Sequence, residues 1–223
     1  MPYTAIMPKP LVPVGNFPIL EIVIRQLKYF GIKEIIISTG HLAELIEAYF
    51  KDGKKWGVAI RYVREKKPLG TAGAIKNISG LDDNFIVMNG DILTTINYKK
   101  LFSFHVQHKT IATIASAKRE VSIDFGVVET DSQNKLLDYI EKPNYFKYVS
   151  MGLNVLNKKC KDYISKSESI GMPELMLRMK SKDEDIRCYR TDAYWLDIGR
   201  IEDYNKAQWE FIKMRNKFLH VKE

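Results

Sequence analysis

The residues of this sequence best suited to chemistry are two aspartates, each standing where a short apolar stretch meets a glycine. Asp91 closes an Asn-Gly-Asp turn after the apolar run 85–88, and Asp197 lies between Leu196 and Ile198-Gly199. A carboxylate at the carboxyl end of a strand lies where open α/β sheets bind their ligands. It is also a natural ligand for Mg²⁺, which commonly brings a substrate phosphate with it. Asp91 is therefore a candidate metal ligand, although an isolated Asn-Gly-Asp is more often only a polar turn.

Two further segments could approach a phosphate. Lys142 stands between Glu141 and Pro143, which restrains the backbone before the proline, and its ammonium could neutralise a phosphate. In isolation, a lysine in this position is more often a surface residue. Gly70 and Thr71 open an expected helix, where small residues let backbone N–H groups come close to a base or a phosphate. Glycines before a helix are equally often a tight turn.

These residues are spaced along a chain in which helices and strands alternate. The order helix, strand, helix, strand implies right-handed crossovers and a mostly parallel sheet, in which the run 85–88 is a strand buried on both faces. The sequence therefore predicts an α/β fold, a Rossmann-like, mostly parallel sheet flanked by helices, with a small β-hairpin subdomain and a C-terminal helix. The expected helices are 18–30 (capped by Asn16), 42–50, one from about 70, 98–108, 173–179 and one from 201, and the expected strands are 34–39, 58–63, 85–88, 111–117, 125–129, 135–140, 150–156 and 185–189.

Bulk composition narrows the class of protein. The 223 residues are 45% hydrophobic, which is enough for one sizeable core and a single domain over residues 1–223. No apolar run approaches the length of a membrane span, and we expect no membrane partner. Cys160 and Cys188 form no metal-binding pattern, so a reduced, cytoplasmic protein is expected. The net charge of +8 is spread along the chain, which favours an anionic small substrate or a solvated basic surface over nucleic acid.

Six motifs occur in one order, and together they carry a resemblance to a known family. The sequence resembles the sugar-1-phosphate nucleotidyltransferases, also called nucleoside-diphosphate-sugar pyrophosphorylases, over nearly the whole chain from Pro2 to about Tyr204. Any one motif is weakly specific, whereas six in the right order are highly specific. The motifs are Pro8-Lys9-Pro10-Leu11 with Pro13-Val14, Gly70-Thr71-Ala72-Gly73, Asn89-Gly90-Asp91, Phe125-Gly126-Val127-Val128, Glu141-Lys142-Pro143 and Trp195-Leu196-Asp197-Ile198-Gly199.

The resemblance implies a reaction in which a sugar 1-phosphate attacks the α-phosphorus of a nucleoside triphosphate, giving a nucleotide sugar and pyrophosphate. By the same resemblance, Asp91 and Asp197 hold the catalytic Mg²⁺ and converge on one site although they are far apart in the sequence. The attacking phosphate is already ionised, so no general base is needed, and catalysis is mostly positioning and electrostatic stabilisation. The other matched positions are Lys142 at the sugar phosphate, Lys9 near the triphosphate, Gly70 and Thr71 beside the base, and Gly126, Glu141 and Gly152 in a sugar pocket on the hairpin subdomain.

The beginning of the chain departs from the family. Members that resemble it begin with a buried central strand and a loop of the form Gly-Gly-x-Gly-Thr-Arg-Leu, whereas residues 1–4 match the segment immediately after that loop. The chain is thus N-terminally truncated relative to the family, either by a misplaced start or by a genuine truncation. We expect a gap or an exposed groove where the first strand belongs, or another segment or chain in its place. We also expect the 223-residue chain to be poorly soluble and to lack activity.

Three functions compete. The favoured one is nucleotidyl transfer with Mg²⁺ as cofactor and with a nucleoside triphosphate and a sugar 1-phosphate as partners; a homo-oligomer is left open. The second is a non-catalytic sugar-nucleotide binding or regulatory module, which the absent loop permits. The third, a nucleic-acid binder, is suggested by charge alone and ranks well below the others. The version of the first motif in residues 8–14 is closest to mannose- or heptose-type guanylyltransferases, while cytidylyl-, uridylyl- and thymidylyltransferases share it.

Overall fold

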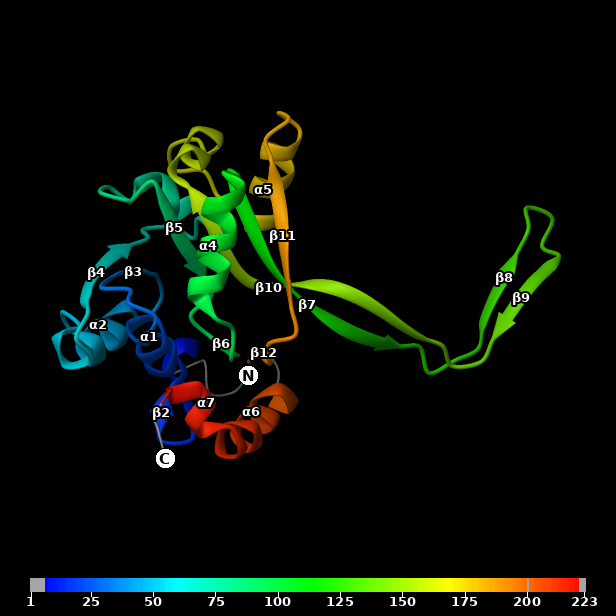
Figure 1. The fold of residues 1–223 in the computed structure, drawn as a ribbon, viewed down its shortest axis with the longest axis horizontal. Helices are drawn as coiled ribbons and strands as arrows, with labels where there is room; N and C mark the ends of the chain where they lie inside the picture. The colour runs from blue at the N-terminus through cyan, green and yellow to red at the C-terminus, as the bar shows by residue number, and fades with distance from the viewer. Residues whose placement is uncertain (1–6, 200, 221–223) are drawn as a thin grey trace.

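The computed structural model describes residues 7–199 and 201–220, which form an α/β body and a long arm that projects from it (Figure 1). No helix in this part of the chain is long and apolar enough to cross a lipid bilayer. The helices are α1 (Ile19–Tyr29), α2 (Ala43–Phe50), α3 (Gly70–Gly73), α4 (Tyr98–His108), α5 (Met172–Lys180), α6 (Ile201–Lys213) and α7 (Arg215–Leu219), and the strands are β1 (Pro13–Val14), β2 (Phe17–Pro18), β3 (Glu34–Thr39), β4 (Ala59–Arg64), β5 (Asn84–Met88), β6 (Ile92–Thr94), β7 (Ala112–Ser122), β8 (Val127–Thr130), β9 (Leu136–Ile140), β10 (Asn144–Asn157), β11 (Ile186–Thr191) and β12 (Trp195–Asp197).

The strands of the body pair in both directions. The largest sheet has the order β11-β7-β10-β5, in which β11 and β7 are parallel and β10 is antiparallel to both of its neighbours. β3 and β4 form a separate parallel pair. The expected α/β fold is confirmed, but the main sheet is mixed rather than mostly parallel, and the expected environment of residues 85–88 is wrong. β5 pairs antiparallel with β10, and its residues are half-buried because its other edge faces a cavity.

This cavity, which we call the slot, lies between β3 and β5 and has a volume of about 830 Å³. Among the described residues, β3 pairs only with β4, and β5 pairs only with β10. Its lining is mainly apolar and comes from both strands and from helices of the body. The expectation of a gap beside the central strands is therefore confirmed. The apolar residues that line it include Leu20, Val23, Ile24 and Leu27 of α1, Ile35, Ile36 and Ile37 of β3, Phe85, Ile86, Val87 and Met88 of β5, and Tyr98 and Phe102 of α4.

α1 lines the slot and also contacts β6 and the C-terminal helices. Its apolar stripe is buried as expected, but Pro18 rather than Asn16 is the residue that caps it, and no side chain bonds to its first turn. Gln26 is buried in the same helix, and its Nε2 donates to the carbonyl oxygens of Thr94 at 2.8 Å and Phe218 at 3.0 Å. These bonds connect α1 to β6 and to the C-terminal helices.

The C-terminal segment is two helices rather than the single helix expected, because the helix breaks at Met214 between α6 and α7. Ala207, Phe211 and Phe218 are buried against residues of β1, β6 and β12, so this segment packs against the short β6–β12 pair. Ile201, expected on the buried face, is exposed.

The arm consists of residues 118–149: the outer halves of β7 and β10 and the β8–β9 hairpin at their tip (Figure 1). The hairpin was expected from the sequence. The extension of β7 beyond residue 117 and of β10 before residue 150 was not, and this extension is what carries the hairpin away from the body.

Candidate functional site

The β6–β12 ladder brings the two candidate aspartates together. Asp91 immediately precedes β6, and Asp197 is the last residue of β12. The strands are antiparallel with Asp197 opposite Ile92, and the backbone N–H of Ile198 donates to the carbonyl oxygen of Asp91 at 3.3 Å. The ends of two short strands, distant in sequence, therefore place both carboxylates at one point of the fold.

Lys9 joins the two carboxylates. Its ammonium is ion-paired with Asp91 and lies 3.5 Å from Oδ1 of Asp197. Burial works against the charged form of Lys9, but the hydrogen bonds and charges of Asp91 and Asp197 outweigh it, so the pKa of Lys9 is raised. The Asp91 side chain is 14% exposed and that of Asp197 is 45% exposed, so the cluster opens to solvent on the Asp197 side.

The donor set of this cluster suits one kind of metal. Within residues 7–199 and 201–220, no group of three or more His, Cys, Asp or Glu side chains gathers as a ready-made metal site. Proteins nevertheless commonly bind Mg²⁺ through only one or two carboxylates. The remaining ligands of the ion are water molecules and oxygens of substrate phosphates. Asp91 and Asp197 thus fit Mg²⁺ in the presence of a phosphate substrate, and Lys9 currently supplies the compensating charge.

Gly152 adjoins this cluster through Asn89. The N–H of Asn89 donates to the carbonyl oxygen of Gly152 at 2.9 Å, two residues before Asp91. Gly152 has φ +68°, and a Cβ there would lie 2.8 Å from Nδ2 of Asn89. Glycine is therefore required both by the backbone conformation and by the close side chain. The sugar contact expected of Gly152 stays a prediction.

Gly70 and Thr71 hold a loop rather than an open ligand site in this structure. Gly70 has φ +73°, and a Cβ there would lie 2.5 Å from the carbonyl oxygen of Ile170. The hydroxyl of Thr71 accepts a hydrogen bond from the N–H of Met172 at 2.7 Å, at the start of α5. Thr71 and Gly90 both line the slot. Local packing accounts for both residues, and their contact with a base stays a prediction.

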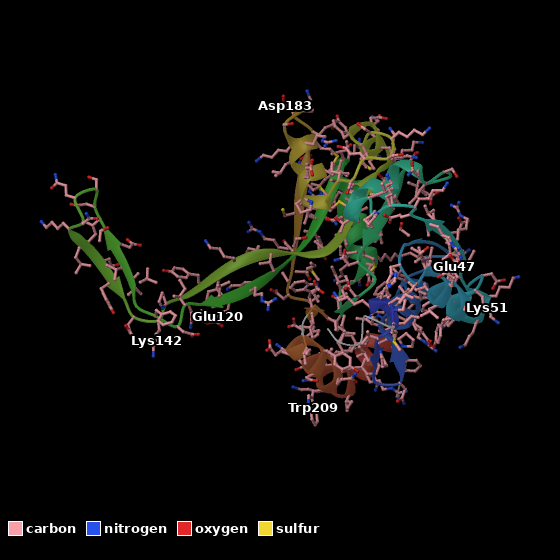
Figure 2. The ribbon with its side chains drawn as sticks, turned by 180° about the vertical axis from the view of Figure 1, so that it is seen from behind. Glu47, Lys51, Glu120, Lys142, Asp183 and Trp209 are labelled. Atoms are coloured by element: carbon pink, nitrogen blue, oxygen red, sulfur yellow. The ribbon has the colours of Figure 1, made fainter. Side chains whose placement is uncertain are left out.

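Gly126, Glu141 and Lys142 all lie on the arm, and the structure does not bring them to the carboxylates. Gly126 precedes β8, and Glu141 and Lys142 follow β9. Figure 2 shows Lys142 beyond Glu120, where the arm bends, well away from the body. Lys142 has φ +45°, a left-handed conformation at this bend. The sequence-predicted site is therefore divided between the body and the arm.

Sequence reasoning missed two residues beside the cluster. The indole Nε1 of Trp195 donates to the carbonyl oxygen of Met151 at 2.8 Å, which fixes β12 against the root of the arm. The Arg119 guanidinium lies 5.9 Å from the centre of the Trp195 ring. An exposed cation thus stands near the start of β12, where it could meet an anionic substrate. In the sequence, Trp195 was present as the first residue of the sixth motif, and Arg119 only as part of the Lys118-Arg119 pair that follows the apolar run 111–117.

Comparisons with known proteins agree with this geometry. The family described as Nucleotidyl transferase matches residues 1–213. The chain is 32% identical to D-glycero-alpha-D-manno-heptose 1-phosphate guanylyltransferase of Aneurinibacillus thermoaerophilus, over 92% of this chain and 89% of that protein. It is 31% identical to UTP--glucose-1-phosphate uridylyltransferase of a Synechocystis species, over 92% of this chain but 58% of that protein. The chain thus spans about three fifths of several curated relatives it matches.

Solved structures show the same likeness. The crystal structure of HddC from Yersinia pseudotuberculosis matches with a TM-score of 0.72 and 26% identity, covering 92% of this chain and 90% of that one. The same protein is known in complex with GMP-PN. A structure described as a putative glucose-1-phosphate thymidylyltransferase from Bacillus anthracis matches with a TM-score of 0.73 and 20% identity, which shows the fold.

Proposed function

Because the chain belongs to the nucleotidyl transferase family, we propose that it makes a nucleotide sugar and pyrophosphate from a nucleoside triphosphate and a sugar 1-phosphate. The observation that carries the proposal is the convergence of Lys9, Asp91 and Asp197 at the ends of β6 and β12. Both substrates are polyanions, so a transferase of this kind needs concentrated positive charge at the point where they meet.

Each site residue has a separate role in bringing the two anionic substrates together. A phosphate oxygen of the sugar 1-phosphate forms a bond to the α-phosphorus, and the bond from that phosphorus to the pyrophosphate oxygen breaks. Asp91 and Asp197 would hold Mg²⁺, which when bound supplies the charge that neutralises phosphate oxygens. Lys9 can turn its ammonium from the carboxylates towards the triphosphate, and Lys142 would bind the sugar phosphate. The attacking group is already ionised, so no side chain has to accept a proton.

The finer proposal concerns the substrates. The curated relatives include a heptose 1-phosphate guanylyltransferase and mannose-1-phosphate guanylyltransferases, the latter 28% identical in Mycobacterium tuberculosis and 31% in Yarrowia lipolytica. We therefore propose GTP with a mannose- or heptose-type 1-phosphate. A uridylyltransferase at 31% identity keeps UTP with glucose 1-phosphate as the pair to test against it.

The test is a matrix of nucleoside triphosphates against sugar 1-phosphates, with the nucleotide sugar identified by mass and pyrophosphate release measured in parallel. We expect one preferred pair, dependence on Mg²⁺, and a loss of about 10²-fold or more in kcat for Asp91→Asn. The matched control is Asp83→Asn, which changes an exposed carboxylate paired with Lys158 on the surface. Product formation that survives Asp91→Asn unchanged would contradict the proposal.

A second function, a sugar-nucleotide binding or regulatory module, is favoured by the slot. An apolar cavity between β3 and β5 would support the site less rigidly than packed elements do, and positioned catalysis needs rigid support. Calorimetry on the same matrix separates the two functions. Binding of a nucleotide or nucleotide sugar without turnover of any pair supports the module, whereas turnover supports the enzyme.

A further inference from the structure

The arm exposes large apolar side chains on both of its faces. In the β8–β9 pair, Val127 lies opposite Ile140, and Val128 lies opposite Tyr139. Because residues alternate between the faces of a strand and paired residues share a face, Val128 and Tyr139 lie on one side and Val127 and Ile140 on the other. The register shifts between Glu129 and Thr130, so Leu136 and Leu137 lie at a β-bulge, where this alternation is interrupted. Leu137 is 64% exposed. A surface that is apolar on both sides and detached from the body is typical of an interaction element.

The root of the arm is fixed. β7 pairs with β11 as far as Ala117, so its inner half is part of the four-stranded sheet. Beyond that point the β7–β10 ladder runs in unbroken register from Ala117–Val149 to Ser122–Asn144. Folding the arm back at its root would break this ladder. The arm therefore leaves the sheet as a continuous two-stranded ladder, and its bend lies at its far end, between residues 122 and 127 and between residues 140 and 144.

The length of the arm places Lys142 far from the carboxylates of its own chain. Gly152 adjoins the cluster through Asn89, and Lys142 is ten positions upstream, almost all of them in extended β10. A strand advances by about 3.3 Å per residue, so Lys142 lies roughly 30 Å from the cluster. Figure 2 shows Lys142 at the bend of the arm, apart from the body that carries Trp209.

A second exposed apolar surface lies on the helix that follows Asp197 in the chain. On α6, Ile201, Trp209 and Ile212 lie on one side of the helix, which we call the α6 stripe, opposite the buried Ala207 and Phe211. Trp209 is 75% exposed. The stripe begins four residues after Asp197. A segment that covered it would therefore lie next to the carboxylates.

We propose that two copies of this chain exchange arms, so that the arm of each covers the α6 stripe of the other and Lys142 of the partner subunit completes the site at Asp91 and Asp197. This inference rests on the proposed function for the role of Lys142. In a dimer with two-fold symmetry, the contact between one chain's arm and the other chain's α6 stripe occurs twice and covers both apolar surfaces of each chain. Exchange of an identical element is also a low-cost route to a dimer. It also explains why the predicted site is divided between the body and the arm. The two sites of the dimer then lie roughly 30 Å apart, which is the reach of one arm.

Complementation between two impaired variants tests the exchange, with the sugar 1-phosphate kept at a concentration at which Lys142→Ala alone has little activity. Asp91→Asn and Lys142→Ala chains are purified separately, mixed in equal amounts, unfolded and refolded together, and assayed. With exchanged arms, about half of the dimers are mixed, and one of their two sites has an intact body and an intact arm, so about a quarter of wild-type activity returns. If Lys142 acts within its own chain, every site keeps one defect, and the mixture stays as inactive as either variant alone, which overturns the inference. Inactive wild-type protein would instead count against the proposed function.

Crosslinking tests the contact between the arm and the α6 stripe without depending on catalytic activity. A photo-crosslinking amino acid replaces Leu137 in ¹⁵N-labelled chains, which are mixed with unlabelled wild-type chains, and the crosslinked peptides are identified by mass. We expect peptides from residues 201–213 joined between labelled and unlabelled chains. Crosslinks confined within one chain, or their absence from α6, overturn the inference.

Sedimentation velocity provides the matched controls. Leu137→Glu and Trp209→Glu each place a charge in the proposed contact and should shift the dimer to monomer at micromolar concentration. Leu177→Glu changes an equally exposed leucine on α5, away from the arm and the α6 stripe, and should leave the dimer intact. A wild-type protein that sediments as a monomer at all concentrations contradicts the exchange.

Discussion

The ammonium of Lys9 is ion-paired with the carboxylate of Asp91, in the position that a divalent cation bound by Asp91 and Asp197 would need. An amine and a metal ion cannot both neutralise the same carboxylate oxygens at close range. Lys9 is therefore a competitor for the metal as well as a candidate ligand of the triphosphate. The arrangement predicts that the triphosphate, by attracting Lys9, helps the metal to bind.

Lys9→Met should strengthen the binding of Mn²⁺ in the absence of nucleotide, by several-fold, because the metal no longer has to displace an ammonium. The measurement is titration of free Mn²⁺ by electron paramagnetic resonance. Lys54→Met, which removes an exposed lysine paired with Asp52, is the control and should leave the affinity unchanged. Equal affinity in the wild type and in Lys9→Met would show that Lys9 does not hold the metal position.

Lys142→Ala should raise the KM for the sugar 1-phosphate and leave the KM for the nucleotide nearly unchanged. An ammonium that meets one substrate phosphate contributes to the binding of that substrate alone. Steady-state kinetics with each substrate varied in turn measures this split. Lys147→Ala, on the outer half of β10, is the control for a general loss of charge on the arm. A change only in the KM for the nucleotide would show that the assigned role is wrong.

Gly152→Ala should destabilise the protein and disturb the site. Its φ of +68° disfavours any other residue, and a Cβ would lie 2.8 Å from the Asn89 side chain beside Asp91. We expect a loss of about 1–3 kcal/mol in the free energy of unfolding, measured in denaturant. Gly40→Ala is the matched control, since a Cβ there has no neighbour within 4 Å and its φ is not positive. If both substitutions cost the same, the backbone conformation of Gly152 and its close contact with Asn89 do not require glycine.

Glu21 should make stability depend on pH in the acid range. Its side chain is buried and accepts hydrogen bonds from Arg25 at 2.6 Å and from Tyr49 at 2.7 Å. Burial opposes the charged carboxylate, but the bonds from Tyr49 and Arg25 outweigh it, so the pKa of Glu21 is lowered. A lowered pKa in the folded state contributes stability above the unfolded value of about 4.3 and loses it as the pH falls below that value.

Glu21→Gln should therefore cost about 1.5–3 kcal/mol in unfolding free energy near neutral pH and progressively less below about pH 4. Denaturant unfolding at a series of pH values gives the difference directly. Glu44→Gln, at an exposed carboxylate 3.7 Å from Arg64, is the control and should change little at any pH. A difference between wild type and Glu21→Gln that stays constant down to pH 3 would mean that the pKa of Glu21 is the same in the folded and the unfolded protein.

Local patterns predicted the elements whose formation depends on nearby residues. The run Glu34–Thr39 is a strand because four of its six residues are β-branched and apolar or hydroxylated at the right length, and Tyr98–His108 is a helix that starts from the side-chain cap of Asn97. The two aspartates could be paired from their motifs. Their contact with Lys9 depends on how a proline-rich segment lies against β6 and β12, which no local pattern contains.

The direction of the arm was also beyond local patterns. Residues 144–149 lie outside the strands expected from the sequence, and they form strand because β7 continues beside them. Tertiary pairing thus extends β10 into the arm that carries Lys142. The motifs predicted which residues form one site. They did not predict that these residues lie on two parts of the fold, the body and the arm.

The slot should accept an extended apolar peptide as an added strand. β3 and β5 each present an edge to it that no described residue pairs with, and an unpaired buried backbone group costs about 1–3 kcal/mol. A strand of six residues, the length of β3, could pair on both sides and bury its side chains on both faces, between α1 and α4 on one hand and the α3 region on the other. An acetylated and amidated peptide rich in valine and isoleucine should therefore raise the unfolding temperature.

The peptide is tested with a second peptide of the same composition in which alternate residues are N-methylated, which removes the donors that a strand needs. At a concentration of 100 times its Kd, the first peptide should stabilise the protein by about 2.7 kcal/mol, while the methylated one should not. Hydrogen exchange should show new protection of amides in β3 and β5, with β8 and β9 on the arm unchanged. If both peptides stabilise the protein equally, or if the new protection lies outside β3 and β5, the slot binds apolar peptides without forming a strand. The facing edges of β3 and β5 would then be stable without a paired strand.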